Sequence, residues 1–203
     1  MINVMLDPLP TEWNGYEVNT DFRIGIQIYI LQYDKDLNKY EKMAIMESLL
    51  FDDRERPDDI QECIEWYLNG WYHDNPTDVT DKCRLVDYDV DQWRIYADFL
   101  KIYGIDLSTV DMHWWMFNGL LWNMPYRQSS FMEVIDIRRK KIKDKMSAEE
   151  KEAIKKAKKI YDLEQQVEKE YTEEEKSRID AYDQMMAEMK KKTEQEALEV
   201  FRR

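Results

Sequence analysis

The chain has 203 residues and a formal net charge of −13, with 43 acidic residues against 30 Lys and Arg. Such a charge repels nucleic-acid phosphates and argues against a protein that binds DNA or RNA through a basic surface. Aromatic residues make up 13% of the chain, which is enough for a hydrophobic core. Residues 1–9 lack a secretory signal and no apolar run has the length of a membrane span, so we expect an intracellular protein with reduced thiols.

The composition changes near residue 128. Residues 1–127 hold 24 acidic and 11 basic side chains, whereas residues 128–203 hold 19 of each and contain no Gly, Pro or Trp. A charged stretch without Gly or Pro is typical of long helices. We therefore predict a mainly α fold, with a compact helical domain and a small N-terminal β-hairpin at 1–140, followed by an extended arm of long charged helices at 141–203.

The first elements are a hairpin and a segment of ambiguous type. Asn14-Gly15 is the dipeptide that a type I′ turn prefers, which predicts a small hairpin within residues 6–19. Thr20 or Asp21 suits the start of a helix, yet the apolar residues between Phe22 and Ile30 alternate as in a strand. The residues alone leave 21–33 open between helix and strand.

Three helices are predicted next. The first covers residues 37–51, the second runs from Pro57 to Gly70, and the third covers residues 91–104. The third carries one polar stripe at spacings of three, four and three, which is formed by Asp91, Arg94, Asp98 and Lys101. Residues 75–89 are polar and are predicted to form a loop.

The stretch "MHWWMFNGLLW", residues 112–122, is apolar on nearly every side if it is helical. Such a helix is buried inside a domain or presents one face to a partner. Core packing is the simpler interpretation, a partner interface is the second, and a cofactor site is the weakest. The candidate residues here are His113, Trp114, Trp115, Phe117 and Leu121.

Beyond Pro125 the chain is predicted to be helical, with new helices at two capping boxes, Ser147-x-x-Glu150 and Thr172-x-x-Glu175. The last helices have narrow apolar stripes, which suit a coiled-coil-like arm or a segment that orders on a partner. The candidate arm contacts are Leu163, Val167, Tyr182, Met186 and Met189. Residues 138–159 hold 11 basic and four acidic side chains, which indicates a solvated helix face or contact with an acidic surface.

No pattern of a metal site or of a catalytic motif is present. Cys63, His73, Cys83 and His113 lack the close pairs that zinc sites show, so we expect no metal and no cofactor. Nucleotide-binding glycine loops and the common nucleophile motifs are missing from the sequence. A pair of carboxylates stays open as the only basis for an enzyme, and nothing marks one pair above the others.

Several segments resemble one protein family. "NTDFRIGIQI" after the hairpin, "YGIDL", and "MHWWMFNGLLWNMP" followed by "FMEVIDIR" are similar to the Gp-fifteen family of long-tailed phages and prophages of Gram-positive bacteria. The family pattern H-W-W-x-F-x-x-L-L, then L-P, then x-I-x-x-I-R, places its arginine at Arg138. The resemblance covers about residues 6–140, is most specific around His113 to Phe117, and has Met112 where the family usually has Leu.

The resemblance implies a helix at 21–33 and a non-enzymatic tail-assembly factor, similar to a tail assembly chaperone, in the host cytoplasm. Its implied partners are the tape-measure protein, the major tail protein, or both, and self-association stays open. Arg138 joins the candidate residues, as part of a partner interface or of the family's core. The alternatives are a structural virion component, such as a head–tail connector or minor tail protein, and an enzyme with a carboxylate-based site.

Overall fold

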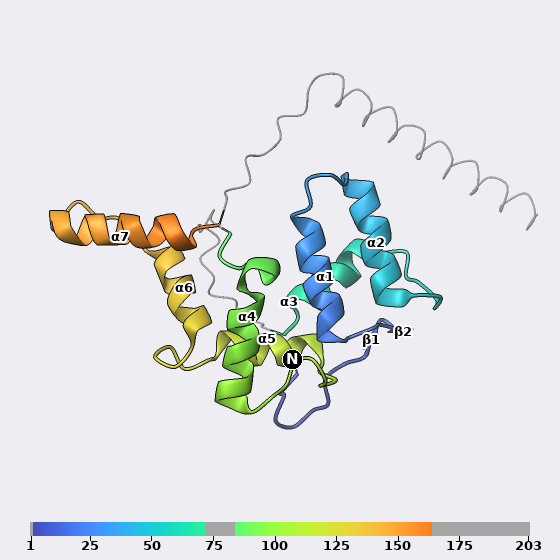
Figure 1. The fold of residues 1–203 in the computed structure, drawn as a ribbon. Helices are drawn as coiled ribbons and strands as arrows, with labels where there is room; N and C mark the ends of the chain where they lie inside the picture. Colours follow the sequence, from blue (N-terminus) through green and yellow to red (C-terminus); the bar gives the residue numbers. More distant parts are fainter. Residues whose placement is uncertain (1, 72–83, 164–203) are drawn as a thin grey trace, which may run out of the picture. The chain divides into compact units, whose positions relative to one another are not determined.

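The computed structural model describes residues 2–71 and 84–163 and confirms the mainly α fold with its N-terminal hairpin (Figure 1). Contacts along the chain group residues 1–165 into one compact unit and residues 166–203 into another, which lies outside the described residues. The elements of the first unit are β1 (Glu12–Trp13), β2 (Tyr16–Glu17), α1 (Phe22–Gln32), α2 (Lys39–Phe51), α3 (Ile60–Asn69), α4 (Tyr88–Asp98), η1 (Phe99–Tyr103), α5 (Trp114–Trp122), α6 (Ser130–Arg139) and α7 (Ala148–Tyr161).

The hairpin forms around the predicted turn. Asn14 and Gly15 both have positive φ, 49° and 87°, as the two central residues of a type I′ turn require. The two short strands pair antiparallel, with Trp13 opposite Tyr16. The local sequence was sufficient to predict this element because the turn chemistry fixes its register.

The ambiguous segment 21–33 is a helix, so the implication of the family resemblance is confirmed and the strand-like alternation was misleading. The Asp21 side chain caps α1 by accepting a hydrogen bond of 2.7 Å from the Arg23 amide. The helix buries a face with a period of three, which comprises Phe22, Gly25, Ile28 and Leu31. The remaining isoleucines lie half-buried on both sides of that face, which gives the alternating pattern in the sequence.

The core lies where α1, α4 and α5 meet (Figure 1). The starts of α1 and α5 are joined by two backbone bonds, in which the Phe22 amide donates to Met112 and the Trp114 amide donates to Thr20. Phe117 of α5 stacks between Phe22 and Phe99, with ring centroids 5.0 and 5.2 Å apart. This pairing fixes α5 against α1 and places the aromatic residues of α5 inside the unit.

The two faces of α4 are used in an unexpected way. Asp91 and Asp98, half of the predicted polar stripe, are buried, with 0% and 3% of their surface exposed. Val90 and Trp93, which lie on another face, are 57% and 75% exposed. The helix continues into the π-helical turn η1 and ends at Gly104, whose φ is 67°. Asp91 and Asp98 of α4 therefore face the core, while Val90 and Trp93 face solvent.

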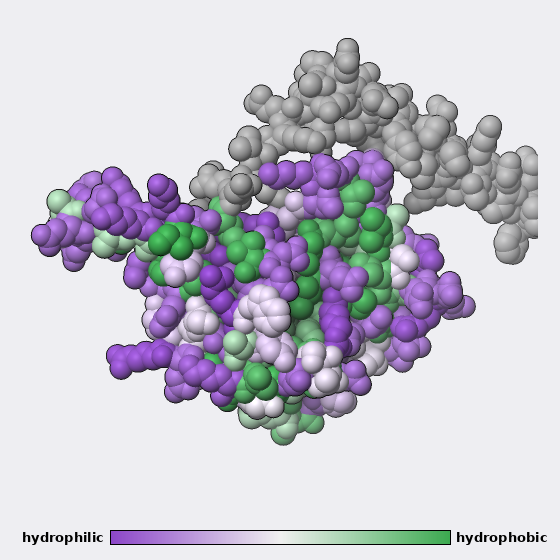
Figure 2. Space-filling view, in the orientation of Figure 1, coloured by the Kyte–Doolittle hydropathy of each residue, from purple (hydrophilic) through white to green (hydrophobic). Residues whose placement is uncertain are grey.

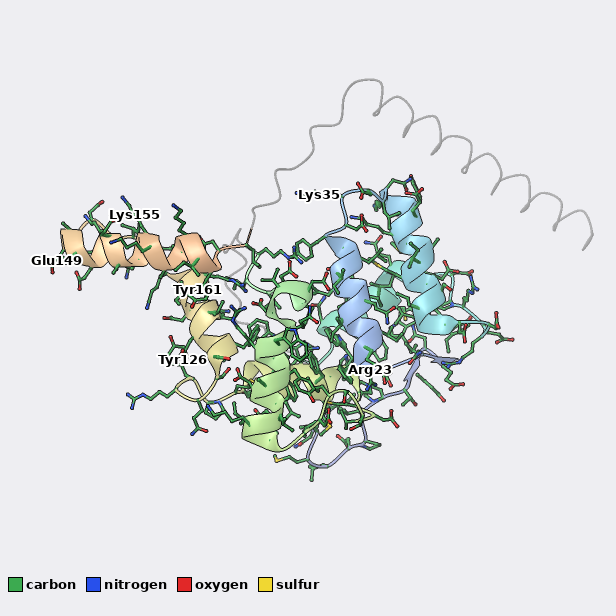
Figure 3. The ribbon with its side chains drawn as sticks, viewed as in Figure 1. Arg23, Lys35, Tyr126, Glu149, Lys155 and Tyr161 are labelled. Carbon is green, nitrogen blue, oxygen red and sulfur yellow. The ribbon has the colours of Figure 1, made fainter. Side chains whose placement is uncertain are left out.

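The C-terminal part of the first unit differs from the expected arm. Helix α6 ends at Arg139, although the chain was predicted to stay helical up to the capping box of Ser147 and Glu150. That capping box starts α7 with both of its hydrogen bonds present. We expected an extended arm from residue 141, but α7 packs on α6, and Tyr161 lies at the end of α7 near α6 (Figure 3). Residues 148–161 thus group with the compact unit.

Two helical glycines give opposite predictions for the same substitution. A Cβ at Gly25 would overlap the indole of Trp114, whereas a Cβ at Gly119 meets nothing within 4 Å. Gly25→Ala should lower the free energy of unfolding by about 1–3 kcal/mol through overpacking. Gly119→Ala should raise it by about 0.5–1 kcal/mol, because alanine loses less backbone entropy in a helix. Urea denaturation of both variants checks this pair, and equal shifts would contradict the packing of Trp114 on α1.

Candidate functional site

The aromatic residues predicted on α5 lie in the core. Trp114 and Trp115 are 2% and 6% exposed, and Phe117 and Leu121 are fully buried. The Trp115 indole nitrogen donates a hydrogen bond of 2.8 Å to the backbone oxygen of Tyr67 in α3. Trp114 packs against Gly25 of α1 and stacks on the Tyr67 ring. These side chains therefore join α5 to α1 and α3, and their surfaces are covered.

His113 caps α5 and ties it to the N-terminal segment. Its Nδ1 accepts a hydrogen bond of 3.0 Å from the Trp115 amide, and its Nε2 lies 2.9 Å from the Pro10 carbonyl oxygen. The neutral ring with its proton on Nε2 satisfies both contacts, since Nδ1 must keep a lone pair. Burial lowers the pKa of His113 from its usual 6.5, and the bond to Pro10 opposes that effect.

This lowered pKa predicts a pH-dependent stability. As the pH falls below 6.5, the unfolded chain takes up a proton on His113 that the folded protein resists. The contribution of the neutral His113 ring to the free energy of unfolding should therefore be fully present above pH 6.5. It should be lost as the pH falls toward the lowered pKa of His113 in the folded protein. His113→Asn keeps a side-chain oxygen that can cap α5 and removes the titration. Urea denaturation between pH 8 and 5.5 should give a flatter profile for the variant; parallel profiles would contradict the proposed tautomer.

Arg138 of α6 is buried and connects three parts of the chain. Its guanidinium forms a bidentate pair with Asp91 of α4, at 2.6 and 3.0 Å, with both side chains almost fully covered. It also donates to the backbone oxygens of Leu85 and Tyr161, at 2.6 and 2.7 Å. Its own carbonyl accepts a hydrogen bond from Lys158 of α7. Arg138 therefore holds α4, α6 and α7 together from the inside and is not exposed to a partner.

Removing this arginine should be costly. Arg138→Met would remove the bidentate partner of the buried Asp91 carboxylate and leave it only the longer contact with the half-exposed Arg94, at 3.3 Å. We expect a loss of about 3–5 kcal/mol in the free energy of unfolding. The neighbouring Arg139 is exposed, so Arg139→Met should change it by less than about 0.5 kcal/mol. Adding Asp91→Leu to Arg138→Met should recover part of the loss. Chemical denaturation of the wild type and the three variants checks this, and a small effect of Arg138→Met alone would contradict it.

The second buried carboxylate of α4 is also fully engaged. Asp98 accepts hydrogen bonds from the hydroxyls of Ser129 and Ser130, and its Oδ2 accepts a bond of 2.9 Å from the Phe131 amide. It thereby satisfies donors at the start of α6. Within residues 2–71 and 84–163, Asp91 and Asp98 are the buried acidic side chains. Each is bonded to groups that hold helices in place, which gives both a structural role.

An apolar groove of about 500 Å³ runs between α1 and α4. Phe22, Ile26 and Ile30, one turn apart on α1, form one wall, and Trp93 and Tyr96 of α4 contribute to the other. The view in Figure 2 shows hydrophobic residues over α1 and α2, between hydrophilic borders. At the N-terminal end of α1 (Figure 3), the Arg23 guanidinium bonds the carbonyls of Leu107 and Val110. The groove thus lies on the surface between two helices of the first unit.

Trp93 stands on the rim of this groove and is the most exposed tryptophan among the described residues. Its ring meets Tyr96 edge-on at 6.0 Å, and 75% of its surface remains open to solvent. Exposed tryptophans are enriched at the centres of protein interfaces. Trp93, Ile26 and Ile30 were not among the site residues predicted from the sequence. The only available signal was the apolar spacing of Val90, Trp93 and Leu100, which the polar stripe on the same helix obscured.

A second cavity, of about 630 Å³, lies beside α5 and the ends of α1 and α3, and Trp114 contributes to its lining. The Trp114 indole nitrogen is buried without a hydrogen-bond partner among the described residues. The guanidinium of Arg84 also lines the cavity, but it already pairs with Asp87 at 3.0 Å and lies over the Tyr33 ring. The groove beside Trp93 is the more apolar of the two sites and suits a protein partner better.

The remaining candidate positions divide by region. Leu163 is half-buried just beyond α7, while Val167, Tyr182, Met186 and Met189 lie outside the described residues. No cluster of three or more possible metal ligands occurs within residues 2–71 and 84–163. In the same part of the chain, no helix combines the length and the apolar character that crossing a bilayer requires.

Comparisons with known proteins add one positive finding. A family model described as "Bacteriophage Gp15 protein" matches residues 5–163. The match includes the hairpin and every helix from α1 to α7. It therefore also includes the buried aromatic residues of α5 and Arg138. No curated protein and no solved structure matches the chain.

Proposed function

We propose that this chain is a non-enzymatic tail-assembly factor. The chain belongs to the bacteriophage Gp15 protein family, because the model of that family matches residues 5–163. Membership in the family indicates a structural or assembly protein of a phage. We propose the more specific role of a tail assembly chaperone in the host cytoplasm, which binds the tape-measure protein, the major tail protein, or both, before they enter the tail.

The observation that carries this proposal is the apolar groove between α1 and α4 with Trp93 on its rim. A chaperone for an assembly protein needs a fixed apolar surface that covers a partner's apolar segment. It also needs a charged exterior that opposes aggregation. The groove supplies the first, and the net charge of −13 supplies the second. The buried carboxylates Asp91 and Asp98 stabilise the fold and therefore do not support the alternative of a carboxylate-based enzyme. Binding of a partner is the simplest function for the apolar groove.

A binding assay tests the role of the groove. Trp93→Ser removes the exposed ring without touching the core, so thermal stability should be nearly unchanged. The affinity for the co-produced tape-measure or major tail protein should fall at least about tenfold, as it does when an interface hot spot is truncated. Ile160→Ser is the matched control, because Ile160 is 73% exposed on α7, away from the groove. Co-purification followed by titration of the purified pair gives the measurement.

Two results would count against the proposal. If neither tail protein co-purifies with the wild-type chain from phage-producing cells, the chaperone role is lost. If the chain instead remains in finished particles in stoichiometric amount, it is a structural virion component such as a connector or minor tail protein. Recovery of the tail proteins from lysate, together with absence of the chain from particles, is the expected outcome.

A further inference from the structure

We propose that α4 and its continuation η1 present an outward helix-docking stripe, consisting of Val90, Trp93 and Ala97 of α4 and Leu100 of η1, and that a single amphipathic helix of a partner protein packs along it. This inference deepens the proposed function and rests on it, because it specifies the part of an assembly partner that the chain recognises. It also extends the binding surface from the groove to the neighbouring face of α4.

The stripe has the spacing of a helix–helix seam. Its residues follow one another at intervals of three, four and three, the pattern of apolar positions that meet a facing helix. Val90, Trp93 and Leu100 are 57%, 75% and 47% exposed, and Ala97 is also exposed. Scattered single apolar residues are common on protein surfaces, but four in a row along one helix indicate a contact surface.

The interior of the unit explains why this face points outward. The opposite face of α4 is held inward by the Asp91–Arg138 pair and by the bonds of Asp98 to the start of α6. Phe99 is fully buried in the aromatic stack, so the π-helical turn that contains it keeps Leu100 on the outside. If α4 rotated to turn its apolar stripe into the core, Asp91 would leave the interior and Arg138 would stay buried without its carboxylate partner.

The charged residues along the two edges of the stripe predict which charges the partner helix carries. Asp89 lies on the edge next to the groove, and Arg94 and Lys101 lie on the other edge at the flanking positions of the seam. Arg94 already contacts Asp91 at 3.3 Å, and Lys101 bonds the Gln128 carbonyl, but both retain further donors. The matching helix therefore carries apolar residues at intervals of three and four, acidic residues facing Arg94 and Lys101, and a basic residue facing Asp89.

The size of the stripe limits its occupant. Leu100 follows Val90 by ten positions, which corresponds to about 15 Å of helix, or three turns of a partner. Four apolar side chains bury far less than the roughly 800 Å² per partner of a stable interface, so the stripe alone does not hold two copies of this chain together. In an antiparallel pair of copies, Arg94 and Lys101 would also face their own equivalents. A long helix that makes further contacts in the groove beside Trp93 fits better.

Photo-crosslinking in phage-producing cells tests the docking of a helix. The photoreactive residue p-benzoylphenylalanine is placed in the full chain at position 93, 97 or 100, and at Tyr126 as a control that is 50% exposed in the loop between α5 and α6 (Figure 3). We expect the three stripe positions to crosslink one phage protein, at sites that shift by three or four residues as the probe moves along α4. Lys101→Glu should weaken binding of that protein about threefold, whereas Lys159→Glu on α7 should not.

Each result decides a separate question. Crosslinked sites with helical spacing in the tape-measure or major tail protein support both the helix-docking stripe and the proposed function. The same spacing in a different phage protein supports the stripe and overturns the proposed partner. Crosslinks that join only copies of this chain, that lack helical spacing, or that are no stronger than those from position 126 overturn the stripe. Co-purification of the tail proteins measures the proposed function independently of these probes.

Discussion

Asp91 lies inside the protein with none of its surface exposed, and it receives two nitrogens of Arg138 in a bidentate pair. Isolated buried charges are strongly unfavourable, so each of these residues requires the other in this position. Arg138 also binds the carbonyls of Leu85 and Tyr161, which brings the segment before α4 and the end of α7 to the same point. The orientation of α4 and the position of α7 depend on this pair, and the bonds of Asp98 to the start of α6 act in the same direction.

The pair also determines which surface remains available for binding. With Asp91 and Asp98 turned inward, α4 must present its other face to solvent, and that face is apolar. The exposed Trp93 and the adjacent groove on α1 follow from this orientation. A stripe that reads as polar in the sequence thus stabilises the interior, and the apolar residues between its members supply the surface that we propose binds a partner.

The residues that resemble the phage family have a different physical role. His113 caps α5, Trp114 packs on Gly25 of α1, and Trp115 bonds the backbone of α3. Together they specify how the aromatic helix fits between its neighbours. In this chain the family pattern falls on residues that pack the core, whereas we propose that the contacts with a partner lie on exposed side chains outside it, such as Trp93. The family match therefore identifies the fold and the broad class, and the exposed surface directs the search for a partner.

The sequence by itself determined those elements whose cause is local. Asn14-Gly15 has the backbone freedom of its turn, and the capping box at Ser147 supplies its own hydrogen bonds, so both were predictable. The residue pattern left segment 22–32 open and only the family resemblance implied a helix there, while the tertiary structure alone decided that α4 turns Asp91 and Asp98 inward. In the first case helix and strand both suit the apolar pattern until α5 packs against it. In the second, burial of Asp91 depends on a cation 47 residues away, and no local pattern carries that information.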